Sequence, residues 1–330
     1  MVKCSNSQVT DYYLEQVGEA FSRTGHMVKY VQSLHGAFSE SKENIMVAAN
    51  IVDAIKAYMR GYRKLVVWFQ GVEPEESYMR HKSMVRYIIL SRMEKFVLRR
   101  ALFRIFVSEA MRRHYERKYG LDIPERTCFC MPCLNTEIHE EAFAKEGKYQ
   151  GNTFVYVGSL AVWQKFEQTV ECYKDVEDAG VPGAKFIVFT KEQEKAKQVL
   201  TKYKVRNYEV KYVPNSELPK HLSSAKYGFI IRDDSIVNRV ATPTKISTYL
   251  SCGVIPIYST VLEDFHHVAG QMKYVIPYSE RLVESINRLS ASGINHMDVL
   301  KEYKEVFDRY YNIKKYVAGL TSKLRSAGLV

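Results

Sequence analysis

Residues 228–258 have the sequence GFIIRDDSIVNRVATPTKISTYLSCGVIPIY, in which two apolar runs flank a polar loop and a helical segment. Residues 226–232 are apolar and β-branched enough to predict a buried strand, and residues 254–258 predict a second one. The loop from Asp233 to Ala241 carries polar turn formers without a helical period. It is therefore expected at the C-terminal end of the first strand.

A helix of about ten residues is expected between this loop and the second strand. Thr242 is predicted to cap it, Pro243 suits its first position, and Gly253 suits the left-handed residue after its end. Lys245 then lies on the first turn, where the helix dipole is already positive, so a lysine there is unfavourable unless an anion is bound. The alternative is a solvated Lys245. The position after a strand's C-terminal edge, where nucleotide-type ligands bind, favours a phosphate.

The composition is that of a folded protein with room for two domains. The chain has 330 residues, of which 46% are hydrophobic and 26% charged. No apolar run reaches the length of a membrane span, and the first residues lack the apolar core of a signal peptide. A cytoplasmic protein is expected. The cluster CFCMPC, residues 128–133, has three of the four ligands of a structural zinc site, so reduced thiols are the preferred interpretation and no metal site is predicted.

The net charge of +11 is concentrated in one region. Between Met79 and Gly120, twelve Lys and Arg, which span residues 80–118, face three Glu, a local excess of +9. Aliphatic and aromatic residues alternate with these cations, which is typical of an amphipathic helix on anionic lipid. A solvated face over an ordinary core carries nearly equal weight, and nucleic acid is the rival partner. The basic region 79–118 is predicted to bind an anionic membrane surface, and no nucleic-acid partner is predicted.

Strands and helices alternate along both halves of the chain, which predicts parallel, doubly wound sheets. Residues 135–152 are polar and are expected to form the linker between the halves. The last stretch, Val299–Leu329, is expected to be helical. The predicted strands are 27–31, 45–50, 64–69, 104–107, 127–131, 153–158, 185–190, 208–213, 226–232 and 254–258; the predicted helices are 9–23, 51–60, the basic segments after 79, one from Ser108, 165–178, 191–203, 216–224 and 243–252.

The segment ATPTKISTYLSCGVIPI resembles a helix of the retaining glycosyltransferases of family 4, in which a Pro-x-Lys or similar opening precedes a Glu-Tyr-x-x-x-Gly body and an apolar strand. Similar segments follow in the family's order over roughly 250 residues, which is more specific than any single motif. These segments are RTGHMVKYV, VVWFQGVEPEES, MEKFVLRRALFRIFVSEAMRRHYERKYG, TFVYVGSLAVWQK and SELPKHLSSAKYGFIIR.

The resemblance implies an α/β protein of the GT-B class. Two doubly wound Rossmann-like domains would face each other across a cleft, and a C-terminal helix would cross back to the first domain. Residues 1–150 would form the acceptor-binding domain, residues 151–305 the nucleotide-sugar-binding domain, and residues 306–330 the returning helix.

The resemblance also implies a donor site around two lysines. Lys165 and Lys245 would hold the donor pyrophosphate, although a solvated Lys165 is an alternative. Relatives have an Arg at the position of Ser159. Its absence either weakens the binding of the pyrophosphate or leaves the role of that Arg to Arg232. Relatives hold the nucleobase at the positions of Val213, Pro214 and Leu218. The other donor-site candidates are Gly158, Asp233, Asn238, Thr242, Pro243, Thr244 and Thr248.

Two departures from the family concern carboxylates and the acceptor side. A pair of Glu residues with seven residues between them is common in relatives, but this chain has Val240 and Thr248 there, so Asp233, Asp234 or Asn238 would have to substitute. The glycine-rich loop before the first helix is replaced by Ser5–Gln8, and Gln70 stands where relatives place a His. The acceptor-side candidates are Ser5, Asn6, Gln70 and Gly71, with Lys165, Lys245 and Gln70 as the catalytic set.

The resulting prediction is a retaining transferase that moves a hexose from a UDP- or GDP-type nucleotide sugar to a lipid-linked surface polysaccharide or glycolipid. Catalysis would be independent of metal and cofactor, because cations and a helix dipole stabilise the leaving phosphate. The protein would be cytoplasmic or peripheral on the inner face of the plasma membrane. The alternative is a non-catalytic module that binds a nucleotide sugar or glycan and has kept the fold.

Overall fold

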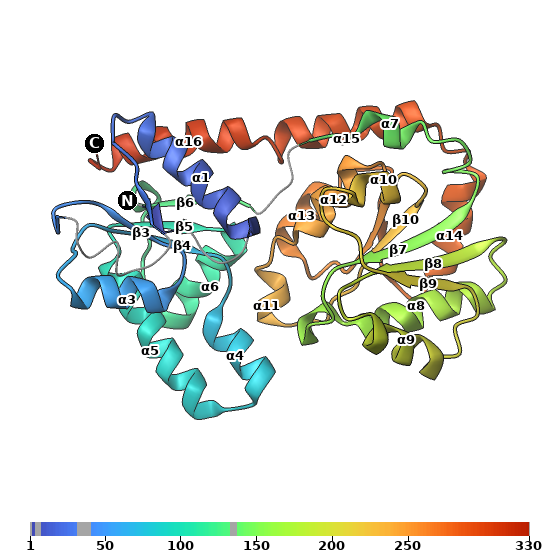
Figure 1. Ribbon diagram of the computed structural model, residues 1–330, viewed down its shortest axis with the longest axis horizontal. Helices are drawn as coiled ribbons and strands as arrows, with labels where there is room; N and C mark the ends of the chain where they lie inside the picture. The colour runs from blue at the N-terminus through green and yellow to red at the C-terminus, as the bar shows by residue number, and fades with distance from the viewer. Residues whose placement is uncertain (1, 4–7, 32–40, 133–136, 330) are drawn as a thin grey trace. The chain divides into compact units, whose positions relative to one another are not determined.

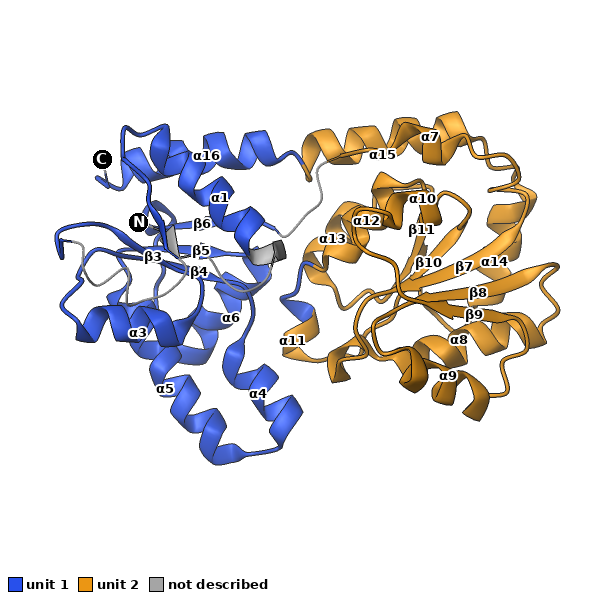
Figure 2. Ribbon diagram, viewed as in Figure 1, with its two compact units in different colours: residues 1–133, 239–242, 312–330 blue, residues 134–238, 243–311 orange. Residues whose placement is uncertain are grey.

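The computed structural model describes residues 2–3, 8–31, 41–132 and 137–329. The chain divides into two compact units (Figure 2). Unit 1 comprises Met1–Cys133, Arg239–Thr242 and Asn312–Val330, and unit 2 comprises Leu134–Asn238 and Pro243–Tyr311. The assignment of acceptor and donor roles to separate domains stays a prediction.

Unit 1 is built on a six-stranded parallel sheet in the order β2-β1-β3-β4-β5-β6 (Figure 1). Its central strand β4 is buried along its whole length, as its unbroken apolar sequence predicts. The strands are β1 (Val2–Lys3), β2 (Tyr30–Val31), β3 (Met46–Ala48), β4 (Leu65–Phe69), β5 (Phe103–Phe106) and β6 (Cys128–Cys130).

The helices α3, α5, α6 and α16 of unit 1 begin at polar caps that the sequence displays, whereas α4 follows Val72 without a side-chain cap. Asn50 caps α3 by accepting from the N–H of Asp53, and Ser108 caps α6 by accepting from the N–H of Met111. The prediction of a helix from Ser108 is confirmed. The helices are α1 (Gln8–Ser22), α3 (Ile51–Met59), α4 (Glu73–His81), α5 (Met84–Arg100), α6 (Glu109–Tyr119) and α16 (Ile313–Ser326), with a 3₁₀ turn at Glu125–Thr127.

The C-terminal helix α16 belongs to unit 1 and packs on α1. The hydroxyl of Thr321 donates to the carbonyl of Ala20 at 3.4 Å, and the guanidinium of Arg325 donates to the carbonyl of Arg23 at 2.9 Å. The return of the C-terminal helix to the first unit is thereby confirmed. The single helical stretch predicted for 299–329 is two helices, because Asn312 caps a new helix by accepting from Lys315.

Unit 2 contains a second six-stranded parallel sheet, in the order β12-β11-β10-β7-β8-β9 (Figure 1). The first strand of the unit, β7, pairs with β8 on one side and β10 on the other, so the strand order reverses there. The strands are β7 (Asn152–Val157), β8 (Ala184–Phe189), β9 (Tyr208–Lys211), β10 (Tyr227–Ile230), β11 (Ile255–Tyr258) and β12 (Ile276–Pro277).

The helices of unit 2 follow the alternation that the sequence predicts. Three of the helices in unit 2, α7, α10 and α11, are only four or five residues long, and α15 is the last helix of the unit. The helices are α7 (Glu140–Phe143), α8 (Phe166–Asp178), α9 (Gln193–Lys202), α10 (Leu218–Leu222), α11 (Ile236–Arg239), α12 (Thr244–Ser251), α13 (Glu263–Ala269), α14 (Leu282–Ala291) and α15 (His296–Arg309), with a 3₁₀ turn at Val162–Gln164.

Much of the stretch expected to be a linker, residues 135–152, is packed into unit 2. Lys148 is 2% exposed, and its ammonium donates to the carbonyls of Ala142, Leu222 and Cys252. These carbonyls lie at the C-terminal ends of α7, α10 and α12, where the helix dipole is negative. The interpretation of this polar stretch as the linker between the halves was wrong over its described residues, which belong to unit 2 and whose Lys148 satisfies three helix ends.

Two details of the 228–258 stretch also differ from the prediction. Residues 236–239 of the expected loop form the short helix α11. Pro243 is the N-cap of α12, which has no side-chain cap, so Thr242 does not fill that role. The end of the helix is as predicted, because Gly253 follows the C-cap with a φ of +67°.

Candidate functional site

The loops after β7 and β10 leave the sheet of unit 2 side by side, because these strands pair with each other. The first loop runs from Gly158 to Lys165, and the second begins with Ile231 and Arg232. They start at the carboxyl edge where the strand order reverses, the usual place for a ligand in an open α/β sheet.

Lys245 reaches back from α12 to the first of these loops. Its side chain passes Gly158, whose φ is +128°; a Cβ placed on this glycine would lie 2.7 Å from Cε of Lys245. Its ammonium donates to Oε1 of Gln164 at 2.6 Å and lies 4.0 Å from the ring centre of Tyr156. Lys245 is 8% exposed, so the alternative of a solvated Lys245 is wrong.

Arg232 adds a second buried cation. It is 5% exposed, its backbone N–H donates to the hydroxyl of Ser259, and its guanidinium donates to the carbonyl of Ile231. Burial lowers the pKa of Arg232 to about 10. Burial and the charge of Arg232 together hold the pKa of Lys245 well below its usual value.

Neither of these two cations forms a salt bridge within the part of the chain that the structure describes. A buried charge without a partner is expensive, and two like charges are more so. An anion with two or more negative charges would lower both the cost of burying each cation and the repulsion between them. We call Lys245, Arg232 and the Gly158–Lys165 loop the cation cluster.

Lys165, the last residue of the loop, forms a salt bridge with a carboxylate. Its ammonium pairs with Oδ2 of Asp233 at 2.9 Å, and both side chains are about one third exposed. Asn238 is 1% exposed and fixes Asp233 by donating to its carboxylate at 2.6 Å. The structure therefore brings Lys165, Asp233 and Asn238 together. Ser159 is exposed, and its carbonyl accepts from the hydroxyl of Tyr156 at 2.6 Å.

The other donor-side candidates lie in unit 2, except Thr242, which belongs to unit 1. Pro243 and Thr244 begin α12, and the hydroxyl of Thr248 donates to the carbonyl of Thr244 at 2.9 Å. Thr242 falls in the 239–242 segment of unit 1. Val213 and Leu218 are buried and Pro214 is exposed, at the end of β9 and the start of α10.

The acceptor-side candidates lie in unit 1 where the structure describes them. Gln70 follows β4, is exposed, and donates its amide to the carbonyl of Ala49 at 3.1 Å. The carbonyl of Gly71 accepts from the hydroxyl of Tyr115 at 3.0 Å. A Cβ at position 71 would lie 2.0 Å from Oε1 of Glu76, so this glycine makes room for that carboxylate. Ser5 and Asn6 lie outside the described residues.

Sequence reasoning missed three residues in or beside the cation cluster. Tyr156 and Gln164 hold the ammonium of Lys245, and Tyr249 donates to and accepts from strand ends, with its hydroxyl 3.1 Å from the N–H of Val157. The one available signal is Gly228, since a Cβ there would lie 2.5 Å from the ring of Tyr249. A glycine inside an apolar strand indicates such a close approach.

No group of three or more His, Cys, Asp or Glu side chains that could hold a metal ion occurs among the described residues. Within the same residues, no helix is both long enough and apolar enough to span a bilayer.

The sequence and the structure were compared with those of known proteins. No family model and no curated protein matches the sequence. Solved structures do match. An α,α-trehalose-phosphate synthase (UDP-forming) from Burkholderia vietnamiensis has a TM-score of 0.64 at 10% identity, over 97% of this chain and 80% of that chain. The fold is GT-B.

Two further GT-B structures are similar over nearly the whole chain. WaaG, a glycosyltransferase involved in lipopolysaccharide biosynthesis, has a TM-score of 0.62 at 14% identity, over 97% of this chain and all of its own. An E. coli structure bound with UDP-2-fluoro glucose has a TM-score of 0.60 at 10% identity, over 97% of this chain and 78% of that chain. At these identities the likeness is one of fold, which confirms the predicted architecture.

Proposed function

We propose that this chain is a retaining glycosyltransferase that moves a hexose from a UDP- or GDP-type nucleotide sugar to a lipid-linked surface glycan. The observation that carries the proposal is the pair of buried cations, Lys245 and Arg232, which form no salt bridge among the described residues, although the charge of Asp233 attracts the guanidinium of Arg232. A donor diphosphate supplies the negative charge that the pair lacks, at the sheet edge where nucleotides bind in this fold class.

The chemistry requires stabilisation of a leaving diphosphate. The bond between the sugar's anomeric carbon and the diphosphate oxygen breaks, and the diphosphate keeps the electron pair. The acceptor hydroxyl bonds to that carbon on the same face, and its proton passes to a diphosphate oxygen. Lys245, Arg232 and the N-terminus of α12 are preorganised to stabilise the growing negative charge. Lys165 would join them by exchanging its bond to Asp233 for a phosphate oxygen.

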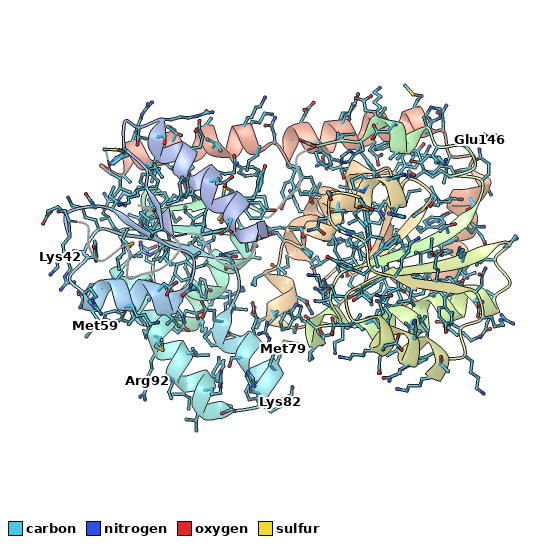
Figure 3. All side chains as sticks on the ribbon, in the orientation of Figure 1. Lys42, Met59, Met79, Lys82, Arg92 and Glu146 are labelled. Atoms are coloured by element: carbon cyan, nitrogen blue, oxygen red, sulfur yellow. The ribbon has the colours of Figure 1, made fainter. Side chains whose placement is uncertain are left out.

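The surface of α5 supports a membrane location for the acceptor. Met84, Val85, Ile88 and Ile89 are 55%, 68%, 44% and 52% exposed, and they share one face of the first half of α5. Lys82 and Arg92, also exposed, lie at the two ends of this face (Figure 3). Exposed apolar side chains edged by cations suit the interface of an anionic bilayer.

Only part of the basic region fits that role. Leu98 and Phe103, which the sequence interleaves with the cations, are core residues with at most 1% exposure. Arg104 donates to the carbonyl of Leu98 at 2.7 Å, and Lys118 pairs with Glu75 and Glu94. The proposed adhesion face is therefore residues 82–92. On α6, Lys118 pairs with carboxylates inside unit 1, whereas Arg113 and Arg117 are exposed.

The competing proposal is a non-catalytic module that binds a nucleotide sugar or glycan. It is favoured by Val240, which replaces a carboxylate of relatives, is 1% exposed, and accepts through its carbonyl from the hydroxyl of Ser108. Release of nucleoside diphosphate from a panel of nucleotide sugars, with membrane extract as acceptor, separates the two proposals. Turnover of one donor supports the transferase. Binding of UDP or GDP without turnover of any donor supports the module.

A further inference from the structure

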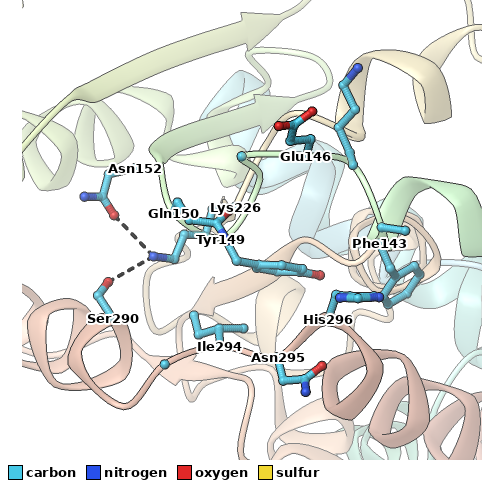
Figure 4. A pocket seen from close by; sticks show the side chains of 14 residues that line it. Phe143, Glu146, Tyr149, Gln150, Asn152, Lys226, Ser290, Ile294, Asn295 and His296 are labelled. Atoms are coloured by element: carbon cyan, nitrogen blue, oxygen red, sulfur yellow. Dashed lines mark hydrogen bonds between the residues drawn. The ribbon is translucent and has the colours of Figure 1, made fainter.

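A cavity of unit 2 lies at the amino ends of β7 and β10 (Figure 4). The cation cluster follows the carboxyl ends of the same two strands. Its volume is about 800 Å³, within the range of small-molecule sites. It is bordered by the 143–152 segment, by the starts of β7 and β10, and by the chain between α14 and α15. We call it the amino-edge cavity.

Lys226 is the unusual residue of the amino-edge cavity. It immediately precedes β10 and is 2% exposed. Its ammonium contacts two neutral oxygens, Oγ of Ser290 at 3.0 Å and Oδ1 of Asn152 at 3.4 Å (Figure 4). No salt bridge to Lys226 is found within the described part of the chain. The ring centre of Tyr227 lies 5.1 Å from the ammonium nitrogen. The ammonium has three N–H donors, of which the two oxygens take two, so one has no oxygen acceptor among these neighbours.

The rest of the lining adds positive potential and hydrogen-bonding amides. Asn295 is the N-cap of α15, so the positive end of a 14-residue helix meets the cavity. Lys145 and His296 also line it, and Glu146, which is exposed, is the opposing charge. The side-chain amides come from Gln150, Asn152 and Asn295. The amide of Asn152 also donates to the carbonyl of Pro182, and Oδ1 of Asn295 accepts from the N–H of Met297, each at 2.9 Å, so these two have part of their capacity left for a ligand.

We propose that the amino-edge cavity binds a phosphorylated sugar, with the phosphate on the ammonium of Lys226 and the sugar hydroxyls on the amides of Gln150, Asn152 and Asn295. An anion supplies the partner that a buried lysine lacks, and a phosphate suits the positive end of α15. Amides both donate and accept, as sugar hydroxyls do. The proposal does not rest on the proposed function, because this cavity shares none of the residues of the cation cluster.

Calorimetric titration of the full chain with glucose 6-phosphate, glucose and inorganic phosphate tests the proposal. Glucose 6-phosphate should bind more tightly than either of the other two. Lys226→Met should weaken it by roughly 10- to 100-fold, the loss expected for a hydrogen bond to a charged group. Ser290→Asp is the second variant, because it keeps the ammonium and places a carboxylate beside it. Ser290→Asp should weaken binding as strongly as Lys226→Met does, and a thermal melt should show that the variant is folded.

Lys245→Ala is the control, since it alters the cation cluster alone and should leave this titration unchanged. Loss of binding in Lys245→Ala, with retention in both Lys226→Met and Ser290→Asp, would show that the sugar phosphate uses the other edge of the sheet. Equal affinity for glucose and glucose 6-phosphate would also overturn the assignment.

A proton-linked signature distinguishes a ligand contact from a structural role. Burial lowers the pKa of Lys226 to about 8. A bound phosphate raises the pKa again, so binding at a pH above 8 must take up a proton. The measured heat at pH 9 should then vary with the ionisation enthalpy of the buffer, and this variation should vanish in Lys226→Met. A heat that is independent of buffer in the unchanged protein contradicts the proposal.

Discussion

Lys245 carries a charge that its folded surroundings do not balance. Its ammonium has a neutral amide, an aromatic face and a second cation as neighbours. Sequence reasoning selected this residue by its place on the first turn of a helix, which the structure confirms. Its burial, its contact with Gln164 and its nearness to Arg232 join segments far apart in the chain, and no local pattern encodes them.

The first prediction concerns Lys245→Ala. Nucleoside diphosphate binding should weaken by about 1.5–3 kcal/mol, as for a hydrogen bond to a charged group. The stability of the ligand-free protein should stay unchanged or rise, because the variant removes a buried charge that Arg232 repels. Titration with UDP and GDP, beside a thermal melt, measures both effects. Lys195→Ala, at an exposed lysine of α9, is the control. Unchanged affinity in Lys245→Ala, or a large loss of stability, would contradict the assignment.

The second prediction concerns Gly158→Ala. The new Cβ would lie 2.7 Å from Cε of Lys245, and the φ of +128° is strained for any other residue. We expect a stability loss of roughly 1–3 kcal/mol and weaker nucleotide binding, because Lys245 must move. Gly180→Ala is the matched control, since its φ is +71° but its Cβ would meet nothing within 4 Å. Gly180→Ala should lose stability and keep its affinity. Equal nucleotide affinity in the two variants would separate Lys245 from the binding site.

At the scale of elements, apolar periodicity predicted most strands and helices of both sheets, because each of these strands is a short apolar run between turn formers. It did not predict β12, α13 or α14. It failed where a contact between distant residues decides the structure. The polar 135–152 stretch is packed because Lys148 satisfies three helix ends, two of which lie more than 70 residues away. The short helix α11 has four residues, too few to show a period.

The third prediction concerns the exposed face of α5. Its apolar residues 84, 85, 88 and 89 should insert at a lipid interface, and Lys82 and Arg92 should attract anionic headgroups. Binding to phosphatidylserine vesicles should weaken with salt. It should also weaken with Arg92→Glu and with the double change Ile88→Asp and Ile89→Asp, measured by co-sedimentation. Arg288→Glu, an exposed cation of α14, is the control. Binding that ignores salt and both variants, or equal affinity for DNA, would exclude the adhesion face.

At the scale of the whole molecule, two buried groups give the free energy of unfolding opposite dependences on pH. In unit 1, Glu94 is fully buried between Tyr115, Tyr119 and Lys118. Burial raises its pKa from 4.5 to about 7, even though Lys118 lowers it. Between these values the folded chain holds a proton that the unfolded chain has released. Stability from this group is therefore lost as the pH rises toward 7.

Lys148 in unit 2 gives the free energy of unfolding the opposite dependence on pH. Burial lowers its pKa from 10.5 to about 7, so above pH 7 the unfolded chain holds the additional proton. Stability from this group rises with pH across that window. Each group contributes a slope of at most about 1.4 kcal/mol per pH unit.

The last prediction follows from these slopes. Glu94→Gln should remove the fall in unfolding free energy between pH 5 and 7 and leave the rise above pH 7, because its amide can still accept from Tyr119 while Lys118 keeps Glu75 at 2.7 Å. Lys148→Met should do the reverse and remove only the rise. Urea unfolding across pH 5–9 measures both slopes, with Glu125→Gln and Lys195→Met as exposed controls. The slopes are compared because each variant also shifts the absolute stability. A Glu94→Gln protein with the unaltered slope below pH 7 would show that this carboxyl is ionised when folded, held so by Lys118.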